Sequence, residues 1–193
     1  MKHFYPFLFL LVFVPVSCSN NLNPREFIQW VENEDNGLRI RQDTPHASYV
    51  AQYEPAVYKA IKTSSTTAPR PGQLKSQQEK YADLHHFLLK VRSKNGSNDG
   101  ISKFLAYQLK DHIHFIRGQD TLNRTVMYHL EGSGGMTPYY RILLAFPKEN
   151  HSGDLQLLIN GNKMDPGRVK FNFSASALTN IPELETENEN DRL

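Results

Sequence analysis

The sequence predicts a single α+β domain, with short N-terminal helices and a mainly antiparallel β-sheet in the C-terminal half. Three observations support this class. A chain of 193 residues fits one domain with a sizeable core, whereas two full domains would be tight. Its 11 Phe and 9 Tyr provide ordinary core-forming side chains. Helical spacing of apolar residues prevails early and strand-like alternation prevails late, without repeated β-α-β units.

The first predicted element is a helix that begins near Pro24, a residue that suits the first helical position. Asn23 before it is a good N-cap, and Glu26 completes the spacing of a capping box. The three-and-four spacing places on one face the apolar residues Phe27, Trp30 and Val31. Gly37 is expected to end the helix.

The segment "GLRIRQDTPHASYVAQYEP" predicts two extended stretches around a turn at residues 43–45, because apolar and charged residues alternate in its first part. A short helix follows, with Pro55 in its first turn. Residues 63–73 have loop composition and are expected to form a surface excursion. Ser76 and Glu79 then have the spacing of a capping box, which predicts a helical turn followed by a strand.

The pattern turns to β-structure after a further helix, which Asp99 is expected to cap. "HIHFIRGQDTLNRTVMYHLEG" has the pattern of a hairpin with its turn at residues 118–121. Alternation continues through the later segments, so residues 112–176 are predicted to form consecutive antiparallel strands. The expected buried set includes Ile113, Phe115, Ile142, Leu144, Val169, Phe171 and Phe173.

Residues 1–17 have the features of an export signal. Lys2 precedes an apolar run at residues 4–16, which is much shorter than the ~20 residues that a membrane-spanning helix needs. The expected organisation is then a signal peptide at 1–17, a lipidated tether at 18–24, an α+β domain at 25–184 and a disordered polar tail at 185–193.

Cys18, the single cysteine, ends this leader and allows three interpretations. It could form an intermolecular disulfide, since the chain holds no partner for it. It could lie beside an ordinary cleavage site after Ser19. It could also carry lipid, because Val16-Ser17-Cys18 resembles the lipobox of bacterial lipoproteins, with Pro15 where most of that family have an aliphatic residue. This resemblance, of the Bacteroidota type, implies acylation of the cysteine and anchoring to a membrane.

The resemblance extends to two further stretches. "WVENEDNGL" and "QYEPAVYKAI" are similar to segments of small envelope lipoproteins of that phylum, and the likeness implies no particular activity. Asp120-Thr121-Leu122 resembles the motif at which such bacteria O-glycosylate exported proteins, so Thr121 is a candidate modification site in an expected turn. The alternative is a plain turn in which Asp and Thr bond to the backbone.

The histidines are the candidates for a metal site. His112 and His114 have the spacing of two ligands on one face of a strand, and His85, His86 or His129 could supply a third. Alternate polar residues on a solvated face explain the same pattern, and no HExxH or cysteine ligand accompanies it. The sequence therefore predicts no metal site and no cofactor.

Two functions follow from these features. The first is a non-catalytic lipoprotein of the cell envelope, anchored on the periplasmic face of the outer membrane and binding a protein or glycan partner. The second is a secreted or anchored hydrolase or metal-dependent enzyme that uses the histidines of the β half. The formal net charge of +2, with interleaved acids and bases, argues against a nucleic-acid partner.

Overall fold

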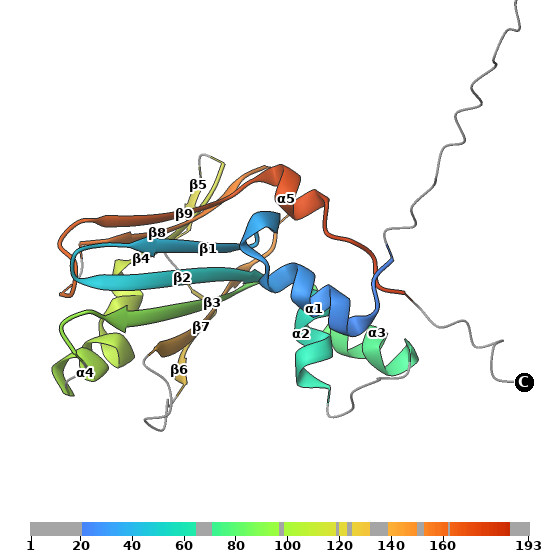
Figure 1. Cartoon of the computed structure of the whole chain (residues 1–193), viewed down its shortest axis with the longest axis horizontal. Coiled ribbons are helices and arrows are strands. Elements are labelled where there is room, and N and C mark those ends of the chain that lie inside the picture. Colours follow the sequence, from blue (N-terminus) through green and yellow to red (C-terminus); the bar gives the residue numbers. More distant parts are fainter. Residues whose placement is uncertain are drawn as a thin grey trace, which may run out of the picture.

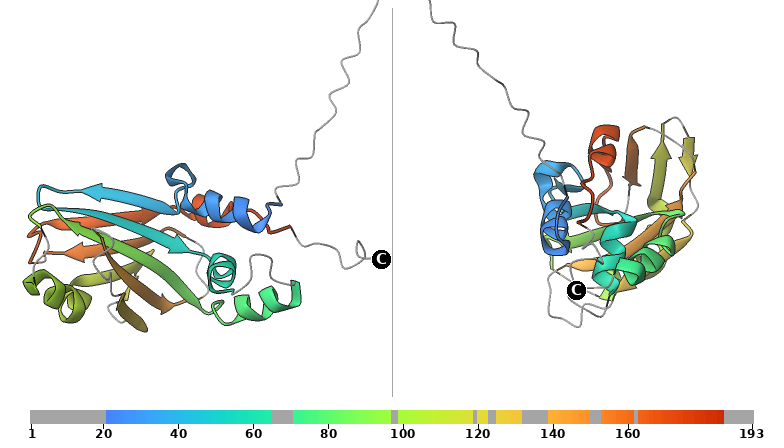
Figure 2. Two further views of the ribbon diagram at one scale, coloured as in Figure 1. Left: turned by 60° about the horizontal axis from the view of Figure 1, so that its bottom comes forward. Right: turned by 90° about the vertical axis from the view of Figure 1, so that its right-hand side faces the viewer.

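The structure, a computed structural model, describes residues 21–64, 71–96, 99–118, 120–122, 125–131, 139–149, 153–161 and 163–185. The expected signal peptide, Cys18 and nearly all of the expected tail lie outside these residues. The described chain forms one α+β domain, as the sequence predicted, with strands mainly in its C-terminal half. Two antiparallel sheets lie against each other, and the helices at residues 24–32, 56–63 and 71–79 gather at one end of them (Figures 1 and 2).

The described helices are short and begin where local chemistry favours them. They are α1 (Pro24–Glu32), α2 (Ala56–Thr63), α3 (Pro71–Glu79), α4 (Asp99–Tyr107) and α5 (Ala175–Thr179), with 3-10 turns η1 (Glu34–Asn36) and η2 (Leu109–His112). The predicted capping box of α1 is confirmed: the Asn23 side chain accepts from the Glu26 backbone, and the Glu26 carboxylate accepts from the Asn23 amide. The chain leaves η1 through Gly37, whose φ of 74° suits glycine.

The nine described strands divide between a five-stranded and a four-stranded sheet. The first sheet has the order β1-β2-β3-β7-β6, and the second has the order β5-β4-β8-β9. The strands are β1 (Arg39–Asp43), β2 (Ala47–Glu54), β3 (Leu84–Ser93), β4 (Ile113–Arg117), β5 (Asp120–Leu122), β6 (Met127–Glu131), β7 (Tyr140–Pro147), β8 (Leu155–Asn160) and β9 (Arg168–Phe173). Every strand pair within each sheet is antiparallel.

Residues 113–173 form the consecutive strands β4 to β9, each paired antiparallel as expected, but these strands divide between the two sheets. β6 and β7 belong to the first sheet, whereas β4, β5, β8 and β9 form the second. β7 pairs with β3 along its whole length. The reason lies in the burial of β7 on both faces: Leu144 is fully buried toward the core, and Ala145 is fully buried on the opposite face. A strand that is buried on both faces fits the interior of a sheet, with a hydrogen-bonded strand along each of its edges. β3 and β6 are those two strands.

Between the sheets lies an aromatic core, and all seven residues of the expected buried set are buried in it. Phe87 of the first sheet is at its centre. Its ring lies 5.3–6.0 Å, centroid to centroid, from four other rings, those of Tyr53, Phe115, Phe146 and Phe173. Because these rings come from both sheets, the cluster joins one sheet to the other.

Two local expectations also need correction. α3 begins at Pro71, inside the expected loop, and Ser76 lies within the helix, where it cannot act as the N-cap. Burial of Leu74 against the core explains the earlier start. The predicted hairpin exists as β4 and β5, but Thr121 lies in strand β5 opposite Ile116, whereas the tight turn follows Arg117.

Both ends of the described domain meet. Leu22 and Leu184 form a parallel bridge, with the Leu22 amide donating to Glu183 O and the Glu185 amide donating to Leu22 O, each at 2.9 Å. Leu22 also packs against the core. The domain therefore begins at Leu22, within the segment that was expected to be a tether. None of the described helices has the length and apolar character needed to cross a bilayer.

The central role of Phe87 predicts a large loss of stability when its ring is removed. Phe87→Ala should lower the free energy of unfolding by about 3–5 kcal/mol, since a buried ring is lost and a cavity remains. Urea unfolding followed by circular dichroism would measure this. Tyr107→Ala is the control, because Tyr107 is 73% exposed and its loss should have little effect. Equal effects of the two substitutions would contradict the assigned core.

Candidate functional site

The face of the first sheet that points away from the aromatic core carries the main cluster of polar side chains. Successive strand residues alternate between faces, so burial of Phe87 and Leu89 in the core places their neighbours on this opposite face. We call it the polar sheet face and define it by Arg39, Gln52, Glu54, His86, Lys90, Glu131 and Arg141. The strand register places Gln52 opposite Arg39, Glu54 opposite His86 and Lys90 opposite Arg141.

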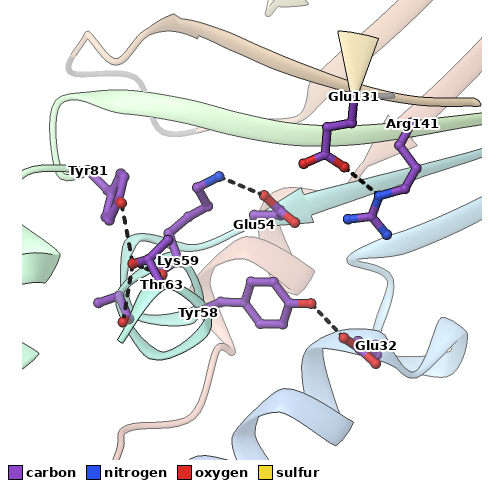
Figure 3. Close-up of polar contacts among 9 residues, drawn as sticks. Glu32, Glu54, Tyr58, Lys59, Thr63, Tyr81, Glu131 and Arg141 are labelled. Carbon is purple, nitrogen blue, oxygen red and sulfur yellow. Dashed lines mark hydrogen bonds and ion pairs between the residues drawn. The ribbon is translucent and has the colours of Figure 1, made fainter. Parts of the chain in front are cut away.

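One end of the polar sheet face is covered by α1 and α2, which add three interactions, two of them drawn in Figure 3. The Lys59 ammonium lies 3.3 Å from Glu54 Oε2, and both side chains are largely buried. The Tyr58 hydroxyl donates to Glu32 Oε1 at 2.6 Å, and the Lys62 ammonium lies 3.4 Å from the same oxygen. These contacts fix the helices on the sheet and engage both carboxylates.

The pKa values of the two carboxyl groups move in opposite directions. Burial raises the pKa of Glu54, and the nearby Lys59 ammonium only partly offsets this. Burial acts in the same direction on Glu32, but the hydrogen bond from Tyr58 and the charge of Lys62 lower its pKa overall. Burial, and then the bond to Glu32, raises the pKa of the Tyr58 hydroxyl.

His86 is a buried ionisable ring on this face, with 4% of its surface exposed. Its ring lies edge-on to that of Tyr81, at 5.4 Å between centroids. Neither ring nitrogen makes a hydrogen bond of good geometry with a described residue. A contact with the Tyr81 backbone acts to raise the pKa of His86, because it favours the charged ring. Burial, and then the positive charge of Lys59, lowers the pKa of His86 to about 4. The ring is therefore neutral near pH 7.

The other end of the polar sheet face is cationic. Arg141 Nε lies 2.5 Å from Glu131 Oε2 on the neighbouring strand. Arg39 donates to Glu32 O at 3.3 Å, and its Nε lies 3.8 Å from Glu34 Oε1. Lys90 lies directly opposite Arg141 in the sheet, with Arg39 in the adjacent row of residues, and it makes no hydrogen bond or ion pair with a described residue. Burial, followed by the charges of Arg39 and Arg141, lowers the pKa of Lys90.

The sequence-predicted histidines do not come together in the described part of the structure. His112 ends η2, one residue before the strand, because the Ile113 amide closes the 3-10 turn on Lys110 O. His114 is on β4 of the second sheet, whereas His129 is on β6 of the first. His85 faces the aromatic core, where its Nδ1 lies 3.3 Å from the Tyr53 hydroxyl.

No group of three or more His, Cys, Asp or Glu side chains among the described residues could hold a metal ion. Thr121, the candidate glycosylation site, is exposed on edge strand β5. Cys18 lies outside the described residues.

Sequence reasoning singled out histidines and missed most of the polar sheet face. The local signal was present in "LLKVRS", where Lys90 and Arg92 alternate with the buried Leu89 and Val91. It could not show that Lys90 lies opposite Arg141, because these residues are far apart in the chain and meet only through the pairing of β3 with β7. The polar sheet face is suited to binding an anion, since its hydrogen-bond donors outnumber its acceptors.

No protein-family model matches this chain, and no similar protein was found among curated proteins or solved structures.

The lowered pKa of His86 predicts a pH-dependent stability. In the unfolded chain the ring takes up a proton below its ordinary pKa of 6.5, whereas in the folded protein it remains neutral down to about 4. The unfolded state thus binds more protons in this window, and folding becomes less favourable as pH falls through it. Between pH 7 and pH 4, the His86 contribution should reduce the free energy of unfolding by roughly 2 kcal/mol.

Urea unfolding of the parent protein and of His86→Leu at several pH values would measure this contribution. The raised pKa of Glu54 acts in the opposite direction, because the folded state binds the extra proton there, so the comparison must be made between the two proteins. The parent should lose more stability on acidification than the variant. Equal losses would mean that His86 titrates as it does in water.

Proposed function

We propose that this protein is a non-catalytic lipoprotein of the cell envelope, whose domain binds a partner while a lipid on Cys18 holds it at a membrane. The observation that carries the anchor is the position of the single cysteine, which directly follows a short apolar leader with a positive start. Two or three acyl chains at ~0.8 kcal/mol per buried CH₂ would make the attachment effectively permanent.

The meeting of the two domain ends supports a short attachment. Since Leu22 is part of the bridge to Leu184, only residues 19–21 separate it from Cys18. Three residues at ~3.3 Å each reach about 10 Å, so the end of the domain that carries α1 would lie close to the bilayer. The uncharged stretch "SNNLNP" after the cysteine lacks acids, which favours the periplasmic face of the outer membrane in this proposal.

A binding role for the domain is supported by the polar sheet face. Its carboxylates Glu54 and Glu131, and Glu32 of the adjoining α1, each have a cationic or phenolic partner, so none is an obvious free acid or base for catalysis. The excess of positive donors there suits recognition of a ligand. No observation on the described histidines favours the metal-dependent enzyme over this role.

Cys18→Ser tests the anchor. The variant should take up no labelled palmitate and should move from the membrane fraction to the soluble fraction, because serine offers no thiol for the diacylglyceryl group. Fractionation and metabolic labelling of full-length protein would measure both. Asn20→Ser is the matched control, since it changes a nearby residue and keeps the cysteine. A serine variant that remains labelled and membrane-bound would refute the lipid anchor.

A further inference from the structure

Lys90 occupies an unfavourable position for a lysine. It is half-buried, and the side chain directly opposite it on β7 is another cation, Arg141. Like charges that face each other across a strand pair destabilise a sheet. On the other side of Lys90 lies Val50 of β2, which is apolar and almost fully buried. Val50 therefore provides no acceptor for the Lys90 ammonium group.

The carboxylates near Lys90 are already engaged by other groups. Glu32 accepts from Tyr58 and pairs with Lys62, Glu54 pairs with Lys59, and Glu131 pairs with Arg141. Glu34 lies between Arg39 and Arg41, at 3.8 Å and 3.6 Å from their Nε atoms. Lys90 and the ion pairs around it together contain two more cations than carboxylates. The cations are Arg39, Arg41, Lys59, Lys62, Lys90 and Arg141, and the acids are Glu32, Glu34, Glu54 and Glu131.

Buried donors on the same face provide a second, independent observation. Gln52 is 2% exposed, and apart from its contact with the Tyr58 hydroxyl its Nε2 has no hydrogen-bond partner among the described residues. Arg39 lies opposite Gln52, and its buried Nε completes no hydrogen bond with a described residue, although Glu34 Oε1 lies 3.8 Å away. Buried donors without acceptors cost free energy, so an anion that accepted from them and from Lys90, which pairs with no described residue, would stabilise this region.

We propose that the cationic end of the polar sheet face binds an oxyanion of the carboxylate or sulfate class, with Lys90 as its principal contact and Arg39, Gln52 and Arg141 as the surrounding donors. Arginine and lysine donors bind carboxylate and sulfate oxygens through charge-assisted hydrogen bonds. The oxyanion is either a free ion or the acidic group of a sugar. This inference deepens the binding role proposed above and rests on it, but it does not require the lipid anchor.

Binding would be measured by calorimetric titration of purified full-length protein at constant ionic strength. The probes are sodium sulfate and sodium glucuronate, with glucose as the neutral sugar control. The parent protein should show saturable binding of at least one anion and none of glucose. Sulfate binding as tight as that of glucuronate would assign the site to free oxyanions, whereas clearly tighter glucuronate binding would assign it to acidic sugars.

Lys90→Gln removes the principal contact and should weaken binding at least tenfold. The same substitution relieves the repulsion with Arg141, so the variant should melt at a temperature equal to or higher than that of the parent, which separates lost binding from misfolding. Lys110→Gln is the matched control, because Lys110 is exposed on η2 and lies outside the polar sheet face. It should leave the affinity unchanged.

Absence of saturable binding of either anion, or equal affinity of the parent and Lys90→Gln, would overturn the inference. Neither result would affect the anchor, because membrane attachment and palmitate labelling are measured independently of ligand binding. Conversely, a soluble and unlabelled parent protein would refute the anchor and leave this site to be judged by titration alone.

Discussion

The contact between the two sheets through aromatic rings determines the rest of this structure. Phe87 of β3 must face Phe115 and Phe173 of the second sheet, because burial of these rings supplies much of the free energy that holds the sheets together. Successive residues of a strand point to opposite faces. His86 and Lys90, which are one and three residues from Phe87, must therefore lie on the outer face. The polar sheet face is thus a consequence of the core on the other side.

Alternation along single strands was enough to identify the core but not the sheets. Ile113, Val169 and Phe171 could be assigned to the interior because each lies between polar neighbours, and a one-residue slip would have exposed them. Alternation carries no information about which strand pairs with which. β7 has apolar residues on both faces, so its place beside β3 depends on long-range packing that one sequence does not display.

The candidate site was hidden from the sequence for a related reason. Two histidines at short spacing indicate a metal site from the sequence alone, and His112 and His114 are two residues apart. Lys90 and Arg141 are ordinary surface residues in their own segments, and they become unusual only because the sheet places them opposite each other. By contrast, the capping box of α1 is entirely local, and the sequence contained all the information needed to predict it.

The arrangement at the polar sheet face also shows how a domain can keep strain away from its core. Repulsion between Lys90 and Arg141 is located on the outer surface of β3 and β7, whereas the inner surfaces of the same strands carry Leu89 and Ile142, both fully buried. The favourable packing on one face can therefore compensate for unfavourable charge on the other. A strand pair of this kind remains folded while its outer donors are available to a ligand.

The bridge between Leu22 and Leu184 has a mechanical consequence. A pulling force applied through residue 21 acts first on two backbone hydrogen bonds, from Leu22 to Glu183 and from Glu185 to Leu22, which are loaded together. While they hold, the segment after α5 clamps the N-terminal end against the domain. If they open, residues 22 and 23 become free to extend, and the capped first turn of α1 moves about 7 Å further from residue 21. Residues 183–185 therefore regulate how far the domain can reach under tension.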